Sequence, residues 1–258
     1  MTEPYSYDSS DYDGTGTGKT GIAAQITELT KSIFQYGGFY IGRYEAGSET
    51  NRTVSSSDSP QEAPFVVQQD KYPYTYVRWG TDMGDVSDSG GGAVSLSNSL
   101  YPAGSEYGVK SMLCTGAAWD SMLDFVKDSS HNVTSSTSWG NFKSSETYEV
   151  NRGKYGTLQG NGSVSFNDIL GTYLKEKGSG VLLTTGATER NSSKNIYDVA
   201  GNCVEWTTEA MLTDVRIQRG GDCFYSSGDT SARYLRDEGV YADGYPEHSF
   251  RPILYVKL

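Results

Sequence analysis

The sequence predicts a mixed α+β domain with few regular elements and many loops. Two segments, 22–36 and 117–127, carry apolar residues at the spacing of amphipathic helices. Short aromatic or aliphatic runs, such as 39–45 and 180–183, are typical of strands. The stretch 128–165 is rich in Ser, Asn and Gly and is expected to form loops. A compact domain with so many loops needs a fold in which the loops pack on one another.

The first part of the chain predicts a flexible lead followed by a helix and a strand. Residues 1–21 are rich in Ser, Asp, Thr, Gly and Tyr, and we expect the folded domain to span 22–258. The helix Ile22–Tyr36 should end at Gly37, because glycine accepts the left-handed conformation of a helix C-terminus. A strand is expected at Phe39–Glu45.

The middle of the chain predicts two further helices between polar loops. Residues 47–63 and 82–92 read as loops, and the aromatic segment Tyr74–Trp79 between them reads as extended. A short helix is expected at Ala93–Leu100. The second, at Ala117–Lys127, has Thr115 as a suitable N-cap.

Composition and charge exclude several classes of protein. The chain has 258 residues and a formal net charge of −11, and such an acidic surface repels nucleic-acid backbones. It contains no apolar run near the roughly 18 residues that span a bilayer, so no membrane insertion is expected. The first residues are acidic and hydroxyl-rich, which does not resemble a secretory signal. We therefore expect a globular domain that does not bind nucleic acid and does not insert into a membrane.

The three cysteines are Cys114, Cys203 and Cys223. So small and odd a number does not make a disulfide framework. Buried free thiols are the preferred interpretation. A disulfide between Cys203 and Cys223 remains an alternative.

Five short motifs occur in an order that is similar to the formylglycine-generating-enzyme family. They are Gly38–Gly47, Gly116–Asp120, Asn195–Trp206 (NIYDVAGNCVEW), Arg219–Gly221 and Ser249–Pro252. Ser249 stands where the family usually has glycine. The resemblance runs from about Gly37 to Leu258 and implies a C-type-lectin-like fold, in which the first strand, Phe39–Glu45, pairs with the last, Phe250–Lys257.

The resemblance also implies how the family's enzymes work, and this chain departs from that pattern. The oxidases use two cysteines, five apart, shortly after Arg-Gly-Gly to bind copper, and here only Cys223 lies there. Related sulfoxide synthases use three histidines, whereas this chain has only His131 and His248. We therefore expect no catalysis. The alternative is a redirected copper/thiol oxidase that recruits Cys203 beside Cys223.

A calcium site is the one cofactor that the resemblance implies. Its ligands would be the side chains of Asp198 and Glu205 and the carbonyl oxygens of Gly201 and Cys203. In the alternative, Asp198 caps a turn and Glu205 accepts hydrogen bonds from backbone amides. No other cofactor is expected.

The C-terminal part is similar to the variable proteins of diversity-generating retroelements, found in phages, prophages and bacteria. In that group, mutation at template adenines rewrites the segment between the last two motifs, here 222–249, into a ligand-binding surface. Adenine mutation of an Asn codon cannot produce Lys, Gln, Met, Trp or Glu. The segment contains none of the first four, and Glu238 and Glu247 are its only exceptions.

We expect this segment to bind a protein or glycan ligand on a cell surface. The protein itself would be displayed on a virion or on the surface of a cell. Tyrosine and phenylalanine supply rigid contact area, and charged residues supply polar contacts. A structural virion protein with a fixed surface is the remaining alternative. The candidate ligand-binding residues are Asp222, Phe224, Tyr225, Ser226, Asp229, Arg233, Tyr234, Arg236, Asp237, Tyr241, Asp243, Tyr245 and His248.

Overall fold

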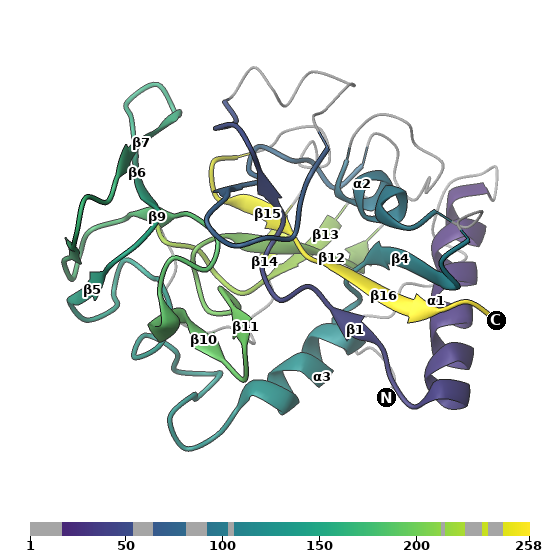
Figure 1. Ribbon diagram of the computed structural model, residues 1–258. Coiled ribbons are helices and arrows are strands. Elements are labelled where there is room, and N and C mark those ends of the chain that lie inside the picture. Colours follow the sequence, from purple (N-terminus) through teal and green to yellow (C-terminus); the bar gives the residue numbers. More distant parts are fainter. Residues whose placement is uncertain are drawn as a thin grey trace.

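The computed structural model describes most of the chain and has a mixed α+β architecture (Figure 1). Figure 1 shows α1 at one edge, beside the C-terminal strand β16, and β5, β6, β7 and β9 at the opposite side. The described residues are 17–53, 64–80, 92–102, 106–212, 215–224, 234–236 and 245–258.

One sheet joins the two ends of the domain in the order β1-β16-β4. Ile41 of β1 lies opposite Ile253 of β16, in antiparallel register. The predicted pairing of the first and last strands is therefore confirmed, although β1 is shorter than expected. Beyond it, Gly42 N still donates to the Pro252 carbonyl at 3.0 Å. The strands are Tyr40–Ile41, Val109–Leu113 (β4) and Pro252–Val256.

A second sheet has the order β14-β13-β12-β15. The pairs β14–β13 and β13–β12 are antiparallel, whereas β15 runs parallel to β12. Because β15 leads directly into β16, the last residues of the chain tie this sheet to the first one. The strands are Val204–Leu212 (β12), Val215–Arg219 (β13), Tyr234–Arg236 (β14) and His248–Phe250 (β15).

The three helices lie near the positions that their apolar spacing predicts. Helix α1 spans Thr17–Tyr36, so it begins within the stretch that we expected to be a flexible lead. Its Leu29 is buried in the same core cluster as Trp119 of α3. Gly37, with φ 87°, ends α1 as expected. The other helices are Ala93–Leu100 (α2) and Gly116–Val126 (α3).

The aromatic segment 74–79 is buried but mostly irregular. The Trp79 indole N–H donates to the Thr207 carbonyl at 2.8 Å, and the Trp206 indole N–H donates to the Val77 carbonyl at 2.9 Å. These reciprocal bonds hold the segment against β12, because a buried indole needs an acceptor. The segment thus completes the core between the second sheet and α2.

Residues 128–165 were expected to be loops, and the prediction is wrong for part of them. A hairpin of β6 and β7 pairs with β9, and β5 pairs with β8. Most side chains of β6 and β7 are not buried, so these strands need few apolar residues and give a weak alternating pattern. The strands are Tyr148–Val150 (β5), Lys154–Leu158 (β6), Val164–Asp168 (β7), Tyr173–Lys175 (β8) and Leu182–Leu183 (β9).

Short two-residue pairings complete the fold. They are Gly47–Ser48 (β2) with Tyr72–Pro73 (β3), and Ser192–Ser193 (β10) with Ile196–Tyr197 (β11), which follows the 3₁₀ turn Glu189–Asn191. Within the described ranges, no helix combines the length and the apolar character that crossing a bilayer requires.

Candidate functional site

The segment 222–249 begins directly after Arg219-Gly220-Gly221, which the structure fixes firmly. Arg219 is buried at the end of β13, and its Nε and Nη2 lie 2.8 and 3.0 Å from the two carboxylate oxygens of Glu209 on β12. Its Nη2 also lies 3.3 Å from Asp120 Oδ1 on α3. A bidentate guanidinium–carboxylate pair fixes both distance and orientation. The N-terminal end of the segment is therefore held to the sheet and to α3.

Gly220 and Gly221 both have positive φ, at 94° and 75°. A Cβ at Gly220 would lie 3.2 Å from the Val199 carbonyl oxygen and 3.3 Å from the Trp119 ring. Glycine is therefore required at this position by backbone conformation and by close packing. In the sequence, the two adjacent glycines after Arg219 suggest tight backbone packing or positive φ, and the structure confirms both.

The C-terminal end of the segment is held by Phe250 and Arg251. The Phe250 ring packs edge-on against Phe65 and Tyr74, with centroids 4.9 and 5.7 Å apart. Arg251 is fully buried, and its Nε and Nη2 lie 3.0 and 2.6 Å from the oxygens of Glu205. Both ends of the segment thus rest on a buried arginine that binds a glutamate of β12.

Three of the predicted ligand-binding residues are buried, which corrects the expectation that they face a ligand. Asp222 turns back on the chain, where its Oδ1 accepts the Phe224 N–H at 2.6 Å. Phe224 packs in an apolar cluster with Cys203 and Cys223. His248 has no exposed surface, and its ring lies 5.3 Å from Trp206. In this arrangement the three side chains pack inside the domain and support the backbone of the segment.

Tyr245 is a candidate whose side chain reaches the surface. It is 43% exposed, and its ring lies 4.9 Å from His248. Its carbonyl oxygen accepts the Tyr76 N–H at 3.0 Å, so its main chain is fixed. Tyr245 is therefore a presented aromatic side chain on a rigid base, which suits recognition.

The remaining candidates divide between β14 and the part of the chain that is not described. Tyr234 and Arg236 lie on β14, opposite Gln218 and Arg216 of β13. The others fall outside the described residues, namely Tyr225, Ser226, Asp229, Arg233, Asp237, Tyr241 and Asp243.

Three buried carboxylates gather where the predicted calcium ligands lie. We call Glu45, Asp198 and Glu205 the carboxylate cluster. Asp198 has φ 57°, and its Oδ2 accepts the Gly186 N–H at 2.6 Å. Glu45 Oε1 accepts a hydrogen bond from the Asn202 amide. Glu45 Oε2 and Asp198 Oδ1 are buried and find no hydrogen-bond partner within the described parts of the chain.

Burial governs the protonation of this cluster. It raises the pKa of Asp198 to about 7, and it raises the pKa of Glu45 well above its usual range, with the neighbouring Asp198 and Glu205 adding to the effect. Burial also raises the pKa of Glu205, although Arg251 opposes that shift. One guanidinium faces three acids, so part of the cluster is expected to hold protons at neutral pH.

The predicted calcium ligands are engaged with groups of the protein itself in this arrangement. Both oxygens of Glu205 accept hydrogen bonds from Arg251, so this carboxylate is paired with a guanidinium here. The Gly201 N–H donates to the Gly220 carbonyl, so this turn serves the packing of Arg219–Gly221. Among the described residues, no group of three or more His, Cys, Asp or Glu side chains is placed to hold a metal ion. Arg251 supplies the counter-charge here.

All three cysteines are free and buried, as the sequence predicts. Burial raises the pKa of Cys203 and of Cys223 well above the usual value. Nucleophilic and metal-binding cysteines act as thiolates, which such an environment disfavours. The arrangement therefore gives little support to copper/thiol chemistry at these two residues.

Comparison of the chain with protein-family models, with curated proteins and with solved structures found no match.

Sequence reasoning missed the roles of Glu45, which lies within Gly38–Gly47 and neighbours Asp198 and Glu205, and of Glu209, which binds Arg219. Arg219 and Arg251 lie in two of the motifs, and a buried arginine needs a carboxylate, so a search for partners was possible in principle. The chain has 32 acidic residues, however, and nothing in their spacing singles out these two.

Proposed function

We propose that this chain is a non-catalytic ligand-binding protein whose recognition surface is carried by 222–249. The observation that carries the proposal is the anchoring of both ends of this segment. Arg219 and Arg251 are both fully buried, and each is bound by a glutamate of the same strand, β12. Binding residues are often carried on loops that a rigid scaffold positions.

The placement of the segment within the second sheet supports the same proposal. Its two described strands, β14 and β15, occupy opposite edges of that sheet, with β13 and β12 between them. Changes between the anchors would then leave the central pair β12–β13 untouched. We further propose that the fold is C-type-lectin-like, of the formylglycine-generating-enzyme type, and that the chain is a variable protein of a diversity-generating retroelement.

The buried residues narrow the proposed contact set. Asp222, Phe224 and His248 are buried and act as supports, whereas Tyr245 is exposed and supplies a contact. The other predicted residues of the segment remain proposed contacts. The ligand is proposed to be a protein or glycan on a cell surface, approached from a virion or a cell. A polar, tyrosine-bearing surface can adapt to either.

Deep sequencing of this gene in its source population tests the proposal. We expect substitutions to concentrate in 222–249 while sparing the supports Asp222, Phe224 and His248 and the anchors Arg219 and Arg251. Substitutions that occur as often at the supports and anchors as elsewhere in the segment would contradict a diversified surface. So would a segment whose sequence is as constant as that of β12 and β13. The second result would favour a structural virion protein with a fixed surface.

A further inference from the structure

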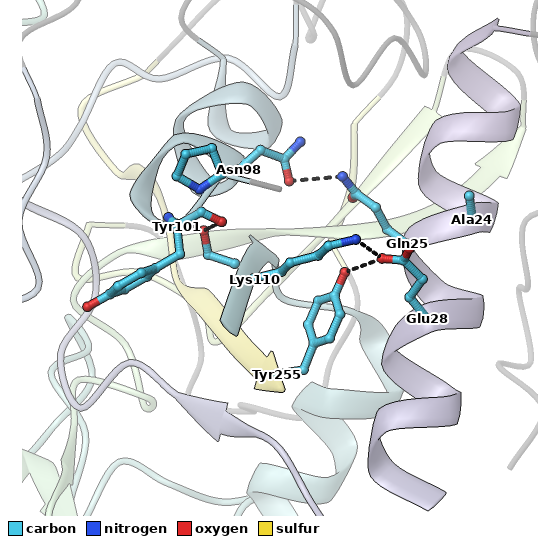
Figure 2. Close-up of a pocket in the computed structure, with 9 residues that line it drawn as sticks. Ala24, Gln25, Glu28, Asn98, Tyr101, Lys110 and Tyr255 are labelled. Atoms are coloured by element: carbon cyan, nitrogen blue, oxygen red, sulfur yellow. Dashed lines mark hydrogen bonds and ion pairs between the residues drawn. The ribbon is translucent and has the colours of Figure 1, made fainter. Parts of the chain in front are cut away.

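A separate cavity of about 320 Å³ lies between α1 and the body of the domain (Figure 2). This volume is at the small end of the range for small-molecule sites, about 300–1,000 Å³. None of its lining residues belongs to 222–249, so the cavity is distinct from the proposed recognition surface. The residues that line it are Ala24, Gln25, Glu28, Asn98, Tyr101, Pro102, Lys110, Ser111 and Tyr255.

An ion pair crosses the cavity from α1 to β4. Lys110 Nζ lies 2.5 Å from Glu28 Oε2, and the Tyr255 hydroxyl donates to the same oxygen at 3.2 Å. Figure 2 shows these three side chains converging on one point. Because both bonds use Oε2, the other oxygen of Glu28 accepts none of the hydrogen bonds found among the described residues. The Glu28 side chain is 43% exposed, so this oxygen can accept a bond from a ligand.

A second bridge crosses the cavity above the ion pair. The Gln25 Nε2 on α1 donates to Asn98 Oδ1 on α2 at 3.1 Å (Figure 2). This bond leaves the Gln25 carbonyl oxygen as a further acceptor that faces the cavity region. At the adjacent corner, the Tyr101 N–H donates to Ser111 Oγ at 2.8 Å, which fixes the chain that leaves α2. The polar groups are thus held in place before any ligand arrives.

The charges of this cavity select against a charged ligand. Glu28 and Lys110 neutralise one another, and a charged ligand would have to break their pair without gaining a counter-ion of its own. Hydroxyl groups can both donate and accept, so they can bond to Glu28 Oε1, to the Gln25 carbonyl oxygen and to the remaining N–H groups of Lys110. Between these polar groups, Tyr101, Pro102 and Ala24 offer apolar surface for C–H groups.

We propose that this cavity binds a small, neutral, polyhydroxylated ligand of the size of a mono- or disaccharide. Such a ligand joins α1 to β4 and α2 through bonds that leave the Glu28–Lys110 pair intact. It also strengthens the attachment of α1, because it binds only when the helix is docked.

Titration of the full chain with glucose and with maltose, followed by amide NMR, tests this proposal. We expect shifts confined to residues around 24–28, 98–102, 110–111 and 255, with a dissociation constant of about 1–10 mM or tighter for at least one sugar. Glucuronate and glucosamine, which carry a charge, should bind at least about fivefold more weakly than glucose. The proposal fails if the cavity amides do not move at about 50 mM sugar, or if a charged analogue binds more tightly.

Two variants assign the binding to the cavity. Glu28→Gln and Gln25→Leu should each weaken sugar binding at least about fivefold, roughly the loss of one hydrogen bond at about 1 kcal/mol. Glu49→Gln is the matched control, because Glu49 pairs with Lys71 at 2.7 Å far from the cavity and should leave binding unchanged. Equal effects of Glu28→Gln and Glu49→Gln would overturn the assignment. The amide spectrum of each variant reports whether it is folded, so loss of structure is distinguished from loss of binding.

Discussion

Arg251 shows how much a single residue contributes to the frame of this protein. Besides its two bonds to Glu205, it donates to the Gly42 carbonyl at 2.8 Å and to the Tyr197 carbonyl at 2.9 Å. These four bonds join the junction of β15 and β16 to β12, to Gly42 just after β1 and to Tyr197 of β11. Arg219 has a similar place at the other end of 222–249, where it binds Glu209.

Arg251→Met should destabilise the domain strongly. The substitution leaves Glu205 buried without its counter-charge, which typically costs about 3–5 kcal/mol. The double variant Arg251→Met/Glu205→Met should recover part of this loss, because it removes the unpaired charge. Urea denaturation measures both. Lys127→Met, which breaks the exposed pair with Asp124, is the control and should change the unfolding free energy by less than about 1 kcal/mol. A double variant no more stable than Arg251→Met would argue against the ion pair as the cause.

Among the elements, the ends of the helices are set by residues close to them in sequence, whereas the small sheets depend on contacts between distant residues. Helix α3 begins where Thr115 Oγ1 accepts the Ala118 N–H at 3.0 Å, and α1 ends at Gly37. The hairpin of β6 and β7, by contrast, is held by contacts such as the stacked rings of Tyr155 and Tyr173, whose centroids lie 3.9 Å apart. Tyr173 belongs to β8, so this contact depends on how separate strands come together. Local spacing does not reveal it.

Thr115→Ala should lower the unfolding free energy by about 1 kcal/mol, because α3 loses its N-cap acceptor. Thr115→Ser keeps the hydroxyl and should restore most of that stability. Thr30→Ala, on the exposed face of α1, serves as a control and should stay within about 0.5 kcal/mol of the parent. Chemical denaturation compares the three. If serine restores nothing, packing of the threonine methyl is the cause and the cap is not.

At the scale of the whole molecule, the carboxylate cluster is where distant parts of the chain meet. Glu45 follows the first strand, Asp198 follows β11, Glu205 lies on β12, and Arg251 lies between β15 and β16. All four are buried. The protonation of this cluster therefore affects the stability of the whole domain, since no part of it can open without exposing the others.

Asp198→Asn should flatten the dependence of stability on pH. Burial raises the pKa of Asp198 from 3.8 to about 7, so its favourable contribution is complete below pH 3.8 and is lost as the pH rises towards 7. Asparagine cannot ionise, tolerates the positive φ, and can still accept the Gly186 N–H. The variant should therefore gain stability relative to the parent as the pH rises through this window, by an amount on the order of 2–4 kcal/mol.

Thermal unfolding across this pH range measures the difference between the variant and the parent. Asp168→Asn is a matched control, because Asp168 is an exposed carboxylate that pairs with Lys154. It should keep the pH profile of the parent. If Asp198→Asn loses stability in parallel with the parent as the pH rises, Asp198 is not the group that holds the proton.

The sequence by itself determined those features that depend on neighbouring residues. It predicted the three helices, the cap at Thr115, the glycines at 220 and 221 that need positive φ, and the free thiols, because each follows from local spacing, conformation or composition. The resemblance of its motifs also predicted the pairing of β1 with β16. The sequence also located the segment 222–249, because recognisable motifs flank it on both sides.

Only the tertiary structure showed that Asp222, Phe224 and His248 of that segment are buried while Tyr245 is exposed. Asp222, Phe224 and His248 have the same chemistry as residues that could bind a ligand, and their burial depends on Cys203, Trp206 and other distant partners. The pairing of Glu205 with Arg251, and the cavity built from α1, α2, β4 and β16, were hidden for the same reason. Contacts between residues far apart in the chain are set by how the elements pack, and a single sequence does not display that packing.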